Sequence, residues 1–315
     1  RSMKYILKKL FALIITLLIV SFLAFLAFSV IPGDPTAKIL GMDASPEQVA
    51  ALRAQLGLDR PVLIRYWEWL TNFIQGDFGT SYSYSQSVGE MLSDKLPVTA
   101  ALTLMSFLFT VVLSIPLGIL AGSVRSRVLD HIITALDQIF MSVPQFFIGI
   151  LMCFTLGLTF RFFVPGEFVS YTQSWPRFLY YMMFPALAIA IPRIAMTVKM
   201  LRGSIRSELS RDYVRTSQSR GSARRTILSR HVVRNAMIPV ITFLAISMAE
   251  IMTGTIVVEQ VFTVPGIGRL LISSISNRDF PVVQAIVVIL AAWIVLVNFL
   301  ADVINQLVDP RIRLQ

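Results

Sequence analysis

Long apolar runs with at most one charged residue constrain the fold of this chain more than any other feature. The first is Leu10–Ile31, which follows Lys4, Lys8 and Lys9. About 20 apolar residues, in a helix that rises about 1.5 Å per residue, cross the hydrocarbon core of a bilayer. Basic residues next to a span favour the cytoplasmic side. The run therefore predicts an uncleaved first membrane span with the N-terminus in the cytoplasm.

The composition agrees with a membrane protein. Hydrophobic residues make up 55% of the chain and charged residues only 15%, whereas about a quarter of an average soluble domain is charged. Further apolar runs bring the prediction to an all-α polytopic protein with six transmembrane helices and both termini cytoplasmic. These runs are Val98–Val124, Ile132–Phe160, Phe178–Val198, Asn235–Val258 and Phe280–Leu307.

Prolines and glycines predict irregular places in these runs. Pro144 lies in the third run, and Pro185 and Pro192 are expected to break the fourth, because proline lacks the N–H that a helix interior uses. Gly118 and Gly122 are four residues apart in the second run. This spacing lets two membrane helices approach closely.

Residues 32–97 are predicted to form an extracytoplasmic cap segment. They contain 5 basic and 8 acidic residues, which places them outside under the positive-inside rule. Ser45-Pro46-Glu47-Gln48 is typical of a helix start with a capping box, and Gly57 supplies a stop. A second helix is expected from Pro61 to Gln75, ending at Gly76. The predicted organisation is an N-terminal tail and span (1–31), the cap segment (32–97) and a membrane core (98–315).

The stretch Arg202–Arg234, called here the arginine-rich segment, lies between the fourth and fifth apolar runs. It holds 9 arginines and 2 acidic residues, and is therefore predicted to be cytoplasmic. Two helices are expected, Ile205–Ser217 and Ala223–Val233, with Gly221-Ser222 as the hinge and Ser222 as N-cap. Arginine pairs four residues apart within such helices would each cost about 0.2–0.5 kcal/mol.

This repulsion predicts an external partner for the arginine-rich segment. Anionic lipid is one candidate and a protein with acidic groups is the other. Helix connections are usually about 2 to 8 residues long, so a segment of this length with its own helices favours the protein.

Several motifs, in order along the whole chain, resemble the dipeptide/oligopeptide and nickel branch of ABC importer permeases. In the arginine-rich segment they are Asp212-Tyr213-Val214-Arg215-Thr216, Gly221, His231, Arg234-Asn235 and Pro239. Elsewhere they are Ile31-Pro32-Gly33-Asp34-Pro35, Val258-Glu259-Gln260-Val261-Phe262, Pro265-Gly266-Ile267-Gly268-Arg269, Asp279-Phe280-Pro281-Val282-Val283-Gln284 and Asp309-Pro310-Arg311-Ile312-Arg313.

The resemblance implies a type I ABC importer permease fold in a prokaryotic inner membrane. It further implies a second homologous permease subunit, two ATP-binding cassette subunits that bind ATP and Mg²⁺, and an extracytoplasmic substrate-binding protein. The arginine-rich segment would couple to the ATPase, through Asp212, Tyr213, Arg215, Thr216, Ser217, Gly221, Ser222, Arg224 and Arg225. Arg215-Thr216-Ser217 stands where the general importer signature has Glu-Ala-Ala, so contacts of that glutamate cannot be transferred.

Ionisable residues inside membrane spans are functional candidates by default. Here they are Asp137, Arg193, Glu250 and Asp302. Glu250 is a candidate for the substrate path, with interhelical hydrogen bonding as the alternative. Arg193 is expected to pair with a carboxylate or to face the pore, and Asp302 to join helices. Glu259 and Phe262 are further substrate-path candidates on the resemblance.

Other functions are weighed against this one. The sequence lacks a Gly-Lys-Ser/Thr phosphate loop, so this chain is not expected to be an ATPase. Its single cysteine, Cys153, and the distant His131 and His231 predict no metal site and no cofactor in this chain. Nucleic-acid binding is not expected, because Tyr213 is the only aromatic residue of the arginine-rich segment. An ion-coupled secondary transporter and a membrane scaffold with a basic docking loop remain the alternatives, and a peptide or a nickel chelate the substrate.

Overall fold

The structure is a computed structural model that describes residues 2–30, 36, 40–41, 45–55 and 57–308. Helices dominate these residues, and their only β-pairing is an isolated bridge between Thr80 and Ser87. The chain divides into two compact units, each described below by itself. The motifs Ile31-Pro32-Gly33-Asp34-Pro35 and Asp309-Pro310-Arg311-Ile312-Arg313 lie outside the described residues.

The first unit joins residues 1–98 to residues 265–296. Its helices are α1 (Ser2–Val30), α3 (Pro46–Gln55), α4 (Val62–Ile74), the start of α5 (Val88–Ser123), α12 (Ile267–Ser276) and most of α13 (Phe280–Val308). α4 packs against α1 through Tyr66 and Leu70, which are buried with Phe25. The Tyr66 hydroxyl lies 2.8 Å from Ser21 Oγ, so a polar contact joins the cap segment to the first span.

The predicted helix boundaries of the cap segment are confirmed. Ser45 N donates to Gln48 Oε1 at 3.1 Å, and Gln48 N donates to Ser45 Oγ at 3.3 Å, the reciprocal bonds of a capping box. Gly57 and Gly76 have φ angles of +65° and +88°. The left-handed backbone of these two glycines ends the helical runs.

Asp279, just before α13, holds residues 81–83 of the cap segment within the first unit. Its buried carboxylate accepts hydrogen bonds from Ser81 Oγ at 2.5 Å, Tyr82 N at 3.0 Å and Ser83 N at 3.2 Å. Three donors on consecutive residues fix the path of residues 81–83. This is a physical reason for an aspartate at the start of the Asp279-Phe280-Pro281 motif.

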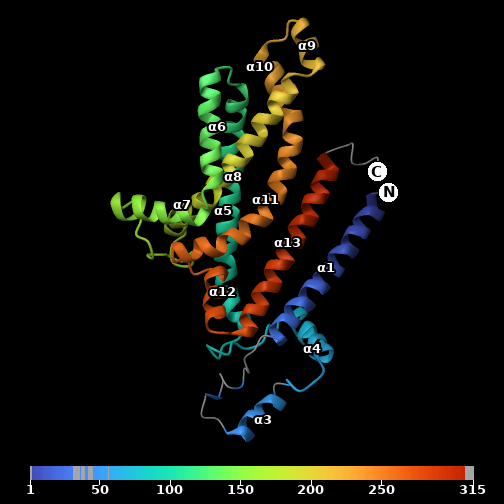
Figure 1. Ribbon diagram of the computed structural model, residues 1–315, viewed down its shortest axis with the longest axis vertical. Helices are drawn as coiled ribbons and strands as arrows, with labels where there is room; N and C mark the ends of the chain where they lie inside the picture. The colour runs from blue at the N-terminus through green and yellow to red at the C-terminus, as the bar shows by residue number, and fades with distance from the viewer. Residues whose placement is uncertain (1, 31–35, 37–39, 42–44, 56, 309–315) are drawn as a thin grey trace. The chain divides into compact units, whose positions relative to one another are not determined.

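The second unit, residues 99–264 and 297–315, is built around α8 (Trp175–Leu209). Its other helices include α6 (Arg127–Ser142), α7 (Gln145–Met152), the π-helix η1 (Cys153–Thr159) and α11 (Val233–Val261). α8 packs against α6, α7 and α11 (Figure 1). Its apolar residues Leu201 and Ile205 are fully buried in this unit.

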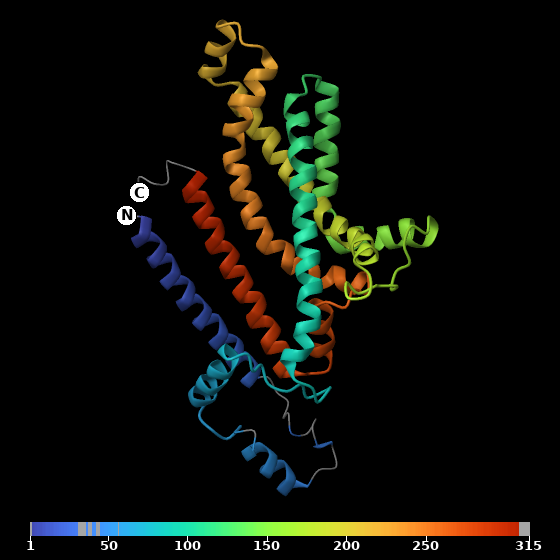
Figure 2. The ribbon, with the colours of Figure 1, turned by 180° about the vertical axis from the view of Figure 1, so that it is seen from behind.

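The predicted close approach at Gly118 and Gly122 is confirmed between α5 and α8, which run close together in Figure 2. A Cβ at Gly118 would lie 2.8 Å from Leu201 Cδ2, and one at Gly122 would lie 2.9 Å from Ile205 Cβ. The absence of a side chain therefore sets the spacing of these helices.

Gly122→Ala is expected to lower stability by about 1–3 kcal/mol, because its methyl group overlaps Ile205 Cβ, which cannot move without the backbone. The matched control is Gly203→Ala on α8, where a Cβ meets nothing within 4 Å. It should be neutral or stabilise by up to about 1 kcal/mol, since alanine is the better helix former. Thermal unfolding in detergent checks both, and equal effects of the two substitutions would contradict the packing argument.

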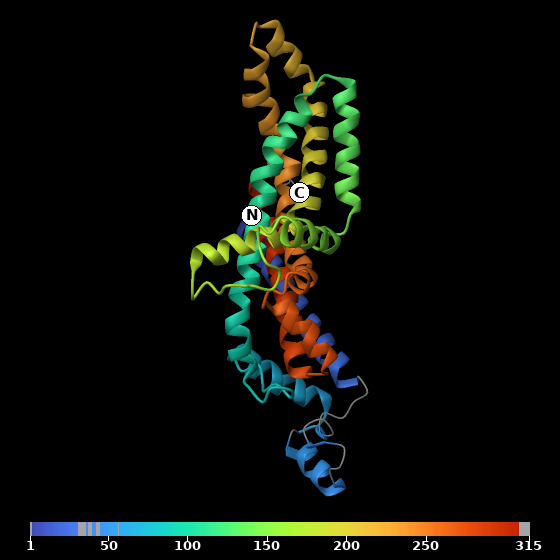
Figure 3. The ribbon, with the colours of Figure 1, turned by 90° about the vertical axis from the view of Figure 1, so that its left-hand side faces the viewer.

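The third predicted span, Ile132–Phe160, is not one straight helix. α6 ends at Ser142 and α7 begins at Gln145, with a bend of 95° between the two helices, visible in Figure 3. Val143 has ψ +124°, as expected for a residue before proline, and Pro144 is the N-cap of α7. In the described part of the chain, five helices are long and apolar enough to cross a membrane, and the number reaches six only if this bent pair is one span.

The predicted breaks at Pro185 and Pro192 are wrong, because α8 continues through both prolines as one helix of 35 residues. Neighbouring helices pack around α8, and packed membrane helices tolerate the lost N–H bonds. α5 likewise begins at Val88, before the predicted start at Val98. Charged residues such as Asp94 end the apolar run but not the helix.

Candidate functional site

The arginine-rich segment forms a folded end of the second unit. α8 supplies its first residues up to Leu209, and then follow α9 (Asp212–Ser219), α10 (Arg224–Ile227) and the π-helix η2 (Leu228–Val232), which leads into α11. Figure 1 shows α9 and α10 at one end of α8 and α11. The predicted helix Ile205–Ser217 is therefore divided at Ser210–Arg211, and the second predicted helix continues into the membrane.

Glu208, in the last turn of α8, holds this end together. Its carboxylate accepts hydrogen bonds from Tyr213 Oη at 2.8 Å and from Asn235 Nδ2 at 3.4 Å, and it lies 2.9 Å from Arg211 Nε in an ion pair. These three residues belong to α9, to α11 and to the turn before α9. One largely buried carboxylate therefore connects three successive parts of the chain.

The role of Glu208 was not predicted from the sequence, although its spacing could have revealed that role. Leu201, Ile205 and Glu208 lie on one face of α8 by the helical repeat, and all three are buried. A charged residue on an apolar face needs partners. The neighbouring Tyr213 and Arg211 supply them.

Apolar side chains pack α9 and α10 against the same end of α8. Val214 of α9 and Ile227 of α10 are each 1% exposed, in one cluster with Leu201 and Ile205. Tyr213 is half-buried, and burial together with its hydrogen bond to Glu208 raises the pKa of its hydroxyl. The hydroxyl therefore remains a donor at neutral pH.

Seven of the nine predicted coupling residues are exposed. Tyr213 and Ser217 are half-buried, whereas Asp212, Arg215, Thr216, Gly221, Ser222, Arg224 and Arg225 are exposed. The hydroxyls of Thr216 and Ser217 donate to the carbonyls of Asp212 and Tyr213 at 3.0 and 2.9 Å. Short polar side chains at these two positions thus bond within α9.

The predicted break between the two helices is confirmed at Gly221, whose φ is +79°. The prediction that Ser222 is the N-cap is wrong, because Ala223 holds that position and no side chain caps α10. Ser222 N instead donates to Ser217 O at 3.2 Å, a bond that closes the end of α9. The polarity of Ser222 is thus not used for capping.

Carboxylates within the chain neutralise part of the arginine charge. Asp130 of α6 lies 2.6 Å from Arg202 and 2.5 Å from Arg206. Arg211 pairs with Glu208, and Arg215 lies 3.8 Å from Asp212. Asp130 was not predicted as a partner of these arginines, because it is more than 70 residues away from them along the chain.

The expected repulsion is wrong for the pairs Arg211/Arg215, Arg220/Arg224 and Arg230/Arg234, since none of them lies within one α-helix. Arg202 and Arg206 are four residues apart in α8, but they share Asp130 as a partner. Arg211 and Arg220 flank α9, and Arg230 lies in the π-helix η2. What remains is a group of exposed arginines that make no ion pair with any described residue. Called here the free arginines, they are Arg220, Arg224, Arg225, Arg230 and Arg234.

Inside the membrane part of the second unit, Arg193 of α8 pairs with Glu250 of α11. This confirms that Arg193 has a carboxylate partner. The Arg193 side chain is 20% exposed and that of Glu250 is 51% exposed. Because lipid does not solvate a carboxylate, this face of α11 requires protein or water beside it.

Glu250→Gln is expected to lower stability by about 1–2 kcal/mol, since it leaves the largely buried guanidinium of Arg193 without its counter-charge. The double variant Arg193→Gln/Glu250→Gln should recover most of that loss. Glu167→Gln, an exposed carboxylate without an ion pair among the described residues, is the matched control. Thermal unfolding and solute uptake are the measurements, and full uptake by Glu250→Gln would remove Glu250 from the substrate path.

Glu259 and Phe262, the other substrate-path candidates, lie in the packed interior of the second unit. Both are 0% exposed. Glu259 Oε1 accepts from Thr99 Oγ1 at 2.5 Å, and the carbonyl of Phe262 accepts from Tyr181 Oη at 2.6 Å. Their contacts account for both residues as packing elements, and their place in a substrate path stays a prediction.

Of the other intramembrane acids, Asp137 lies 3.7 Å from Arg202, and its Oδ2 has no hydrogen-bond partner among the described residues. Close to Asp302, Asn305 Oδ1 accepts from Thr242 Oγ1 at 2.6 Å, which links α13 to α11 within the second unit. The role of Asp302 itself stays a prediction.

Comparison with known proteins places these features in a family. Residues 114–314 match the model of the binding-protein-dependent transport system inner membrane component, and residues 2–103 match the model of its N-terminal part. A putative peptide transport system permease protein of Brucella abortus is 35% identical over 98% of both chains. A probable peptide ABC transporter permease protein of Sinorhizobium fredii is 33% identical over 98% of this chain and 99% of that one. A glutathione transport system permease protein of Salmonella typhi is 35% identical over 99% of both.

The two family models together span almost the whole chain, and each relative aligns over 98% or more of both chains. Several apolar helices and the inner-membrane family identify a multi-pass protein of the plasma membrane. The chain is a permease and belongs to the family of binding-protein-dependent transport system inner membrane components.

Proposed function

We propose that this chain forms half of the pore of an ATP-driven importer. A second, related permease chain would supply the other half, and two ATP-binding cassette subunits would bind ATP and Mg²⁺ and hydrolyse the nucleotide. A substrate-binding protein would deliver the solute to the cap segment outside. Both termini and the arginine-rich segment would face the cytoplasm, as the positive-inside rule predicts.

The free arginines are the observation that supports this proposal most strongly. They lie on an element whose own shape is fixed by Glu208 and by the buried Val214 and Ile227. A fixed surface that concentrates unpaired positive charge complements an acidic groove on another protein. A flexible basic segment can bind anionic lipid without such a fixed structure, so the fixed structure favours a protein partner.

The unbroken α8 supports a route for coupling. It begins at Trp175, carries Arg193 inside the membrane and ends at Leu209 beside α9. A packed helix moves as a rigid body, so a displacement of α9 by the closing ATPase would reach the Arg193–Glu250 pair. We propose that this displacement changes which side of the membrane the pore opens to.

Peptides are the substrate class that we propose. The relatives described above are named for peptide or glutathione transport, and we extend that class to this chain. The nickel chelate, which the motifs alone left open, receives no support from those names.

The proposal is tested by isolation in a mild detergent followed by reconstitution. We expect an ATP-hydrolysing subunit and a second permease chain to copurify, and the proteoliposomes to take up labelled dipeptide only with ATP on the arginine-rich side. Purification without an ATPase, or uptake driven by an ion gradient alone, would contradict the proposal. The latter result would establish the secondary transporter.

A further inference from the structure

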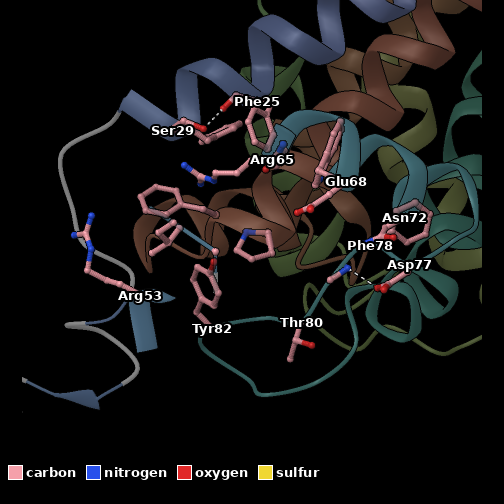
Figure 4. A pocket seen from close by; sticks show the side chains of 18 residues that line it. Phe25, Ser29, Arg53, Arg65, Glu68, Asn72, Asp77, Phe78, Thr80 and Tyr82 are labelled. Atoms are coloured by element: carbon pink, nitrogen blue, oxygen red, sulfur yellow. Dashed lines mark hydrogen bonds between the residues drawn. The ribbon is translucent and has the colours of Figure 1, made fainter. Parts of the chain in front are cut away.

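The first unit contains a cavity of about 690 Å³ that the proposed coupling does not use. Its volume is within the range of about 300–1,000 Å³ that small-molecule sites occupy. α1, α3, α4, the loop around Thr80 and the start of α13 line it (Figure 4). Phe25, Phe28, Trp69 and Phe280 give it an aromatic wall.

Arg65 of α4 brings a positive charge into this cavity. The residue is half-buried, and its guanidinium lies 5.7 Å from the centre of the Phe25 ring. Within the described ranges it makes no ion pair with a carboxylate. The nearest arginine along the chain, Arg60, differs because its Nη1 donates to Glu68 Oε1 at 2.7 Å.

Tyr82 supplies a second donor to the cavity. Asp279 fixes its backbone, accepting from Tyr82 N and from the residues on either side. Burial, with a smaller contribution from Asp279, raises the pKa of the Tyr82 hydroxyl, and Arg65 is near enough to oppose that shift. The hydroxyl is thus protonated at neutral pH and makes no hydrogen bond to the described residues.

Gln284 of α13 is the third lining donor, at 8% exposure. Its Nε2 has no hydrogen-bond partner in the part of the chain that the structure describes. A buried donor without an acceptor is costly, and most buried polar groups in proteins are satisfied. Because Nε2 itself is buried, an acceptor in the cavity becomes its partner once the Gln284 side chain turns towards the cavity.

The acidic lining residues lie at the exposed edge. Glu68 is 53% exposed, and Asp77, whose Oδ1 accepts from Gly79 N at 2.9 Å, is exposed as well. Donors without acceptors are thus in the half-buried and buried part of the cavity, and carboxylates are at its rim. This order of charges matches a zwitterion that carries an apolar side chain.

We propose that this cavity binds a small zwitterionic solute of dipeptide size, with its carboxylate at Arg65, Tyr82 and Gln284 and its ammonium group towards Glu68 and Asp77. The aromatic wall receives the apolar side chain. The site would be a subsite of the permease itself, apart from any binding protein. It rests on the proposed function only in the choice of a peptide as ligand.

Binding of alanyl-phenylalanine to the full chain in nanodiscs, without ATP, is the test. Equilibrium dialysis compares the free dipeptide with its C-terminal amide and its N-acetyl form. We expect the amide to bind about tenfold more weakly, because it loses the charge-assisted bonds to Arg65. The N-acetyl form should lose about threefold, since solvent screens the rim carboxylates.

Two variants separate recognition from folding. Arg65→Gln should weaken binding of the free dipeptide about tenfold and leave the amide unchanged. Gln284→Leu removes a donor without a partner, so thermal stability should stay the same or rise while dipeptide binding falls. Lys95→Gln, which removes the same charge from the same unit outside the cavity lining, is the matched control.

Equal affinity for the free dipeptide and its amide, or unchanged preference in Arg65→Gln, would overturn the site. Because dialysis needs no ATPase, the outcome is independent of coupling. Dipeptide binding without ATP-driven uptake would support the site and contradict the proposed function. ATP-driven uptake without dipeptide binding to this cavity would support the proposed function and contradict the site.

Discussion

Glu208→Ala is expected to release α9 from the end of α8. Arg211 would lose its ion pair, and Tyr213 and Asn235 would lose a largely buried hydrogen-bond acceptor. Hydrogen bonds to a charged group contribute about 1.5–3 kcal/mol, and the ion pair of the exposed Arg211 contributes less than the bond from the half-buried Tyr213. We expect a local loss of about 2–3 kcal/mol, which is about a 30-fold or greater fall in amide exchange protection across Ser210–Gly221.

Asp212→Ala is the matched control for this substitution, since it removes the other acidic residue of the arginine-rich segment. Asp212 is 98% exposed and lies 3.8 Å from Arg215. The substitution should lower stability by less than about 1 kcal/mol, because it removes only an exposed ion pair and a favourable negative charge in the first turn of α9. If the two variants lost protection equally, Glu208 would not be the centre of this structure.

Arg224→Glu/Arg225→Glu is expected to abolish recovery of the ATPase and to reduce ATP-driven uptake at least about tenfold. Both side chains are exposed, and the described residues hold no carboxylate paired with them, so folding should be preserved. Reversing a charge next to an acidic partner replaces attraction by repulsion, which costs several kcal/mol at an interface. Copurification and uptake in proteoliposomes are the measurements.

Arg125→Glu/Arg127→Glu makes the same charge change at another exposed place of the second unit, in the turn before α6 and at the first residue of α6. We expect it to leave copurification of the ATPase intact. Equal loss in both variants would mean that general membrane electrostatics, rather than a docking surface, holds the ATPase. Unchanged uptake in Arg224→Glu/Arg225→Glu would contradict the coupling role.

Local sequence patterns predicted the elements whose causes are themselves local. The capping box at Ser45 and the left-handed glycines at Gly57, Gly76 and Gly221 depend on neighbours along the chain. The spacing of Gly118 and Gly122 predicted a close approach. It could not identify α8 as the partner, because any helix with a suitable face would satisfy that spacing.

Features that depend on distant residues were predicted poorly. Pro144 ends α6 with a 95° bend, whereas Pro185 and Pro192 leave α8 continuous. The difference lies in what surrounds each proline and not in the residue type. Asp130 of α6 pairs with Arg202 and Arg206 of α8, which no local pattern predicts. Gln284 belongs to a motif that was noted only for its resemblance to the family, and the motif did not indicate that its amide is buried without a partner.

A photo-cross-linker placed at Ser222 tests the central claim most directly. Ser222 is exposed beside the free arginines, and its side chain makes no hydrogen bond to the described residues. In the native membrane, we predict a covalent product with an ATP-hydrolysing subunit from position 222 and none from position 125. Products with lipid alone, or the same product from both positions, would contradict the assignment of the arginine-rich segment as the ATPase-docking element.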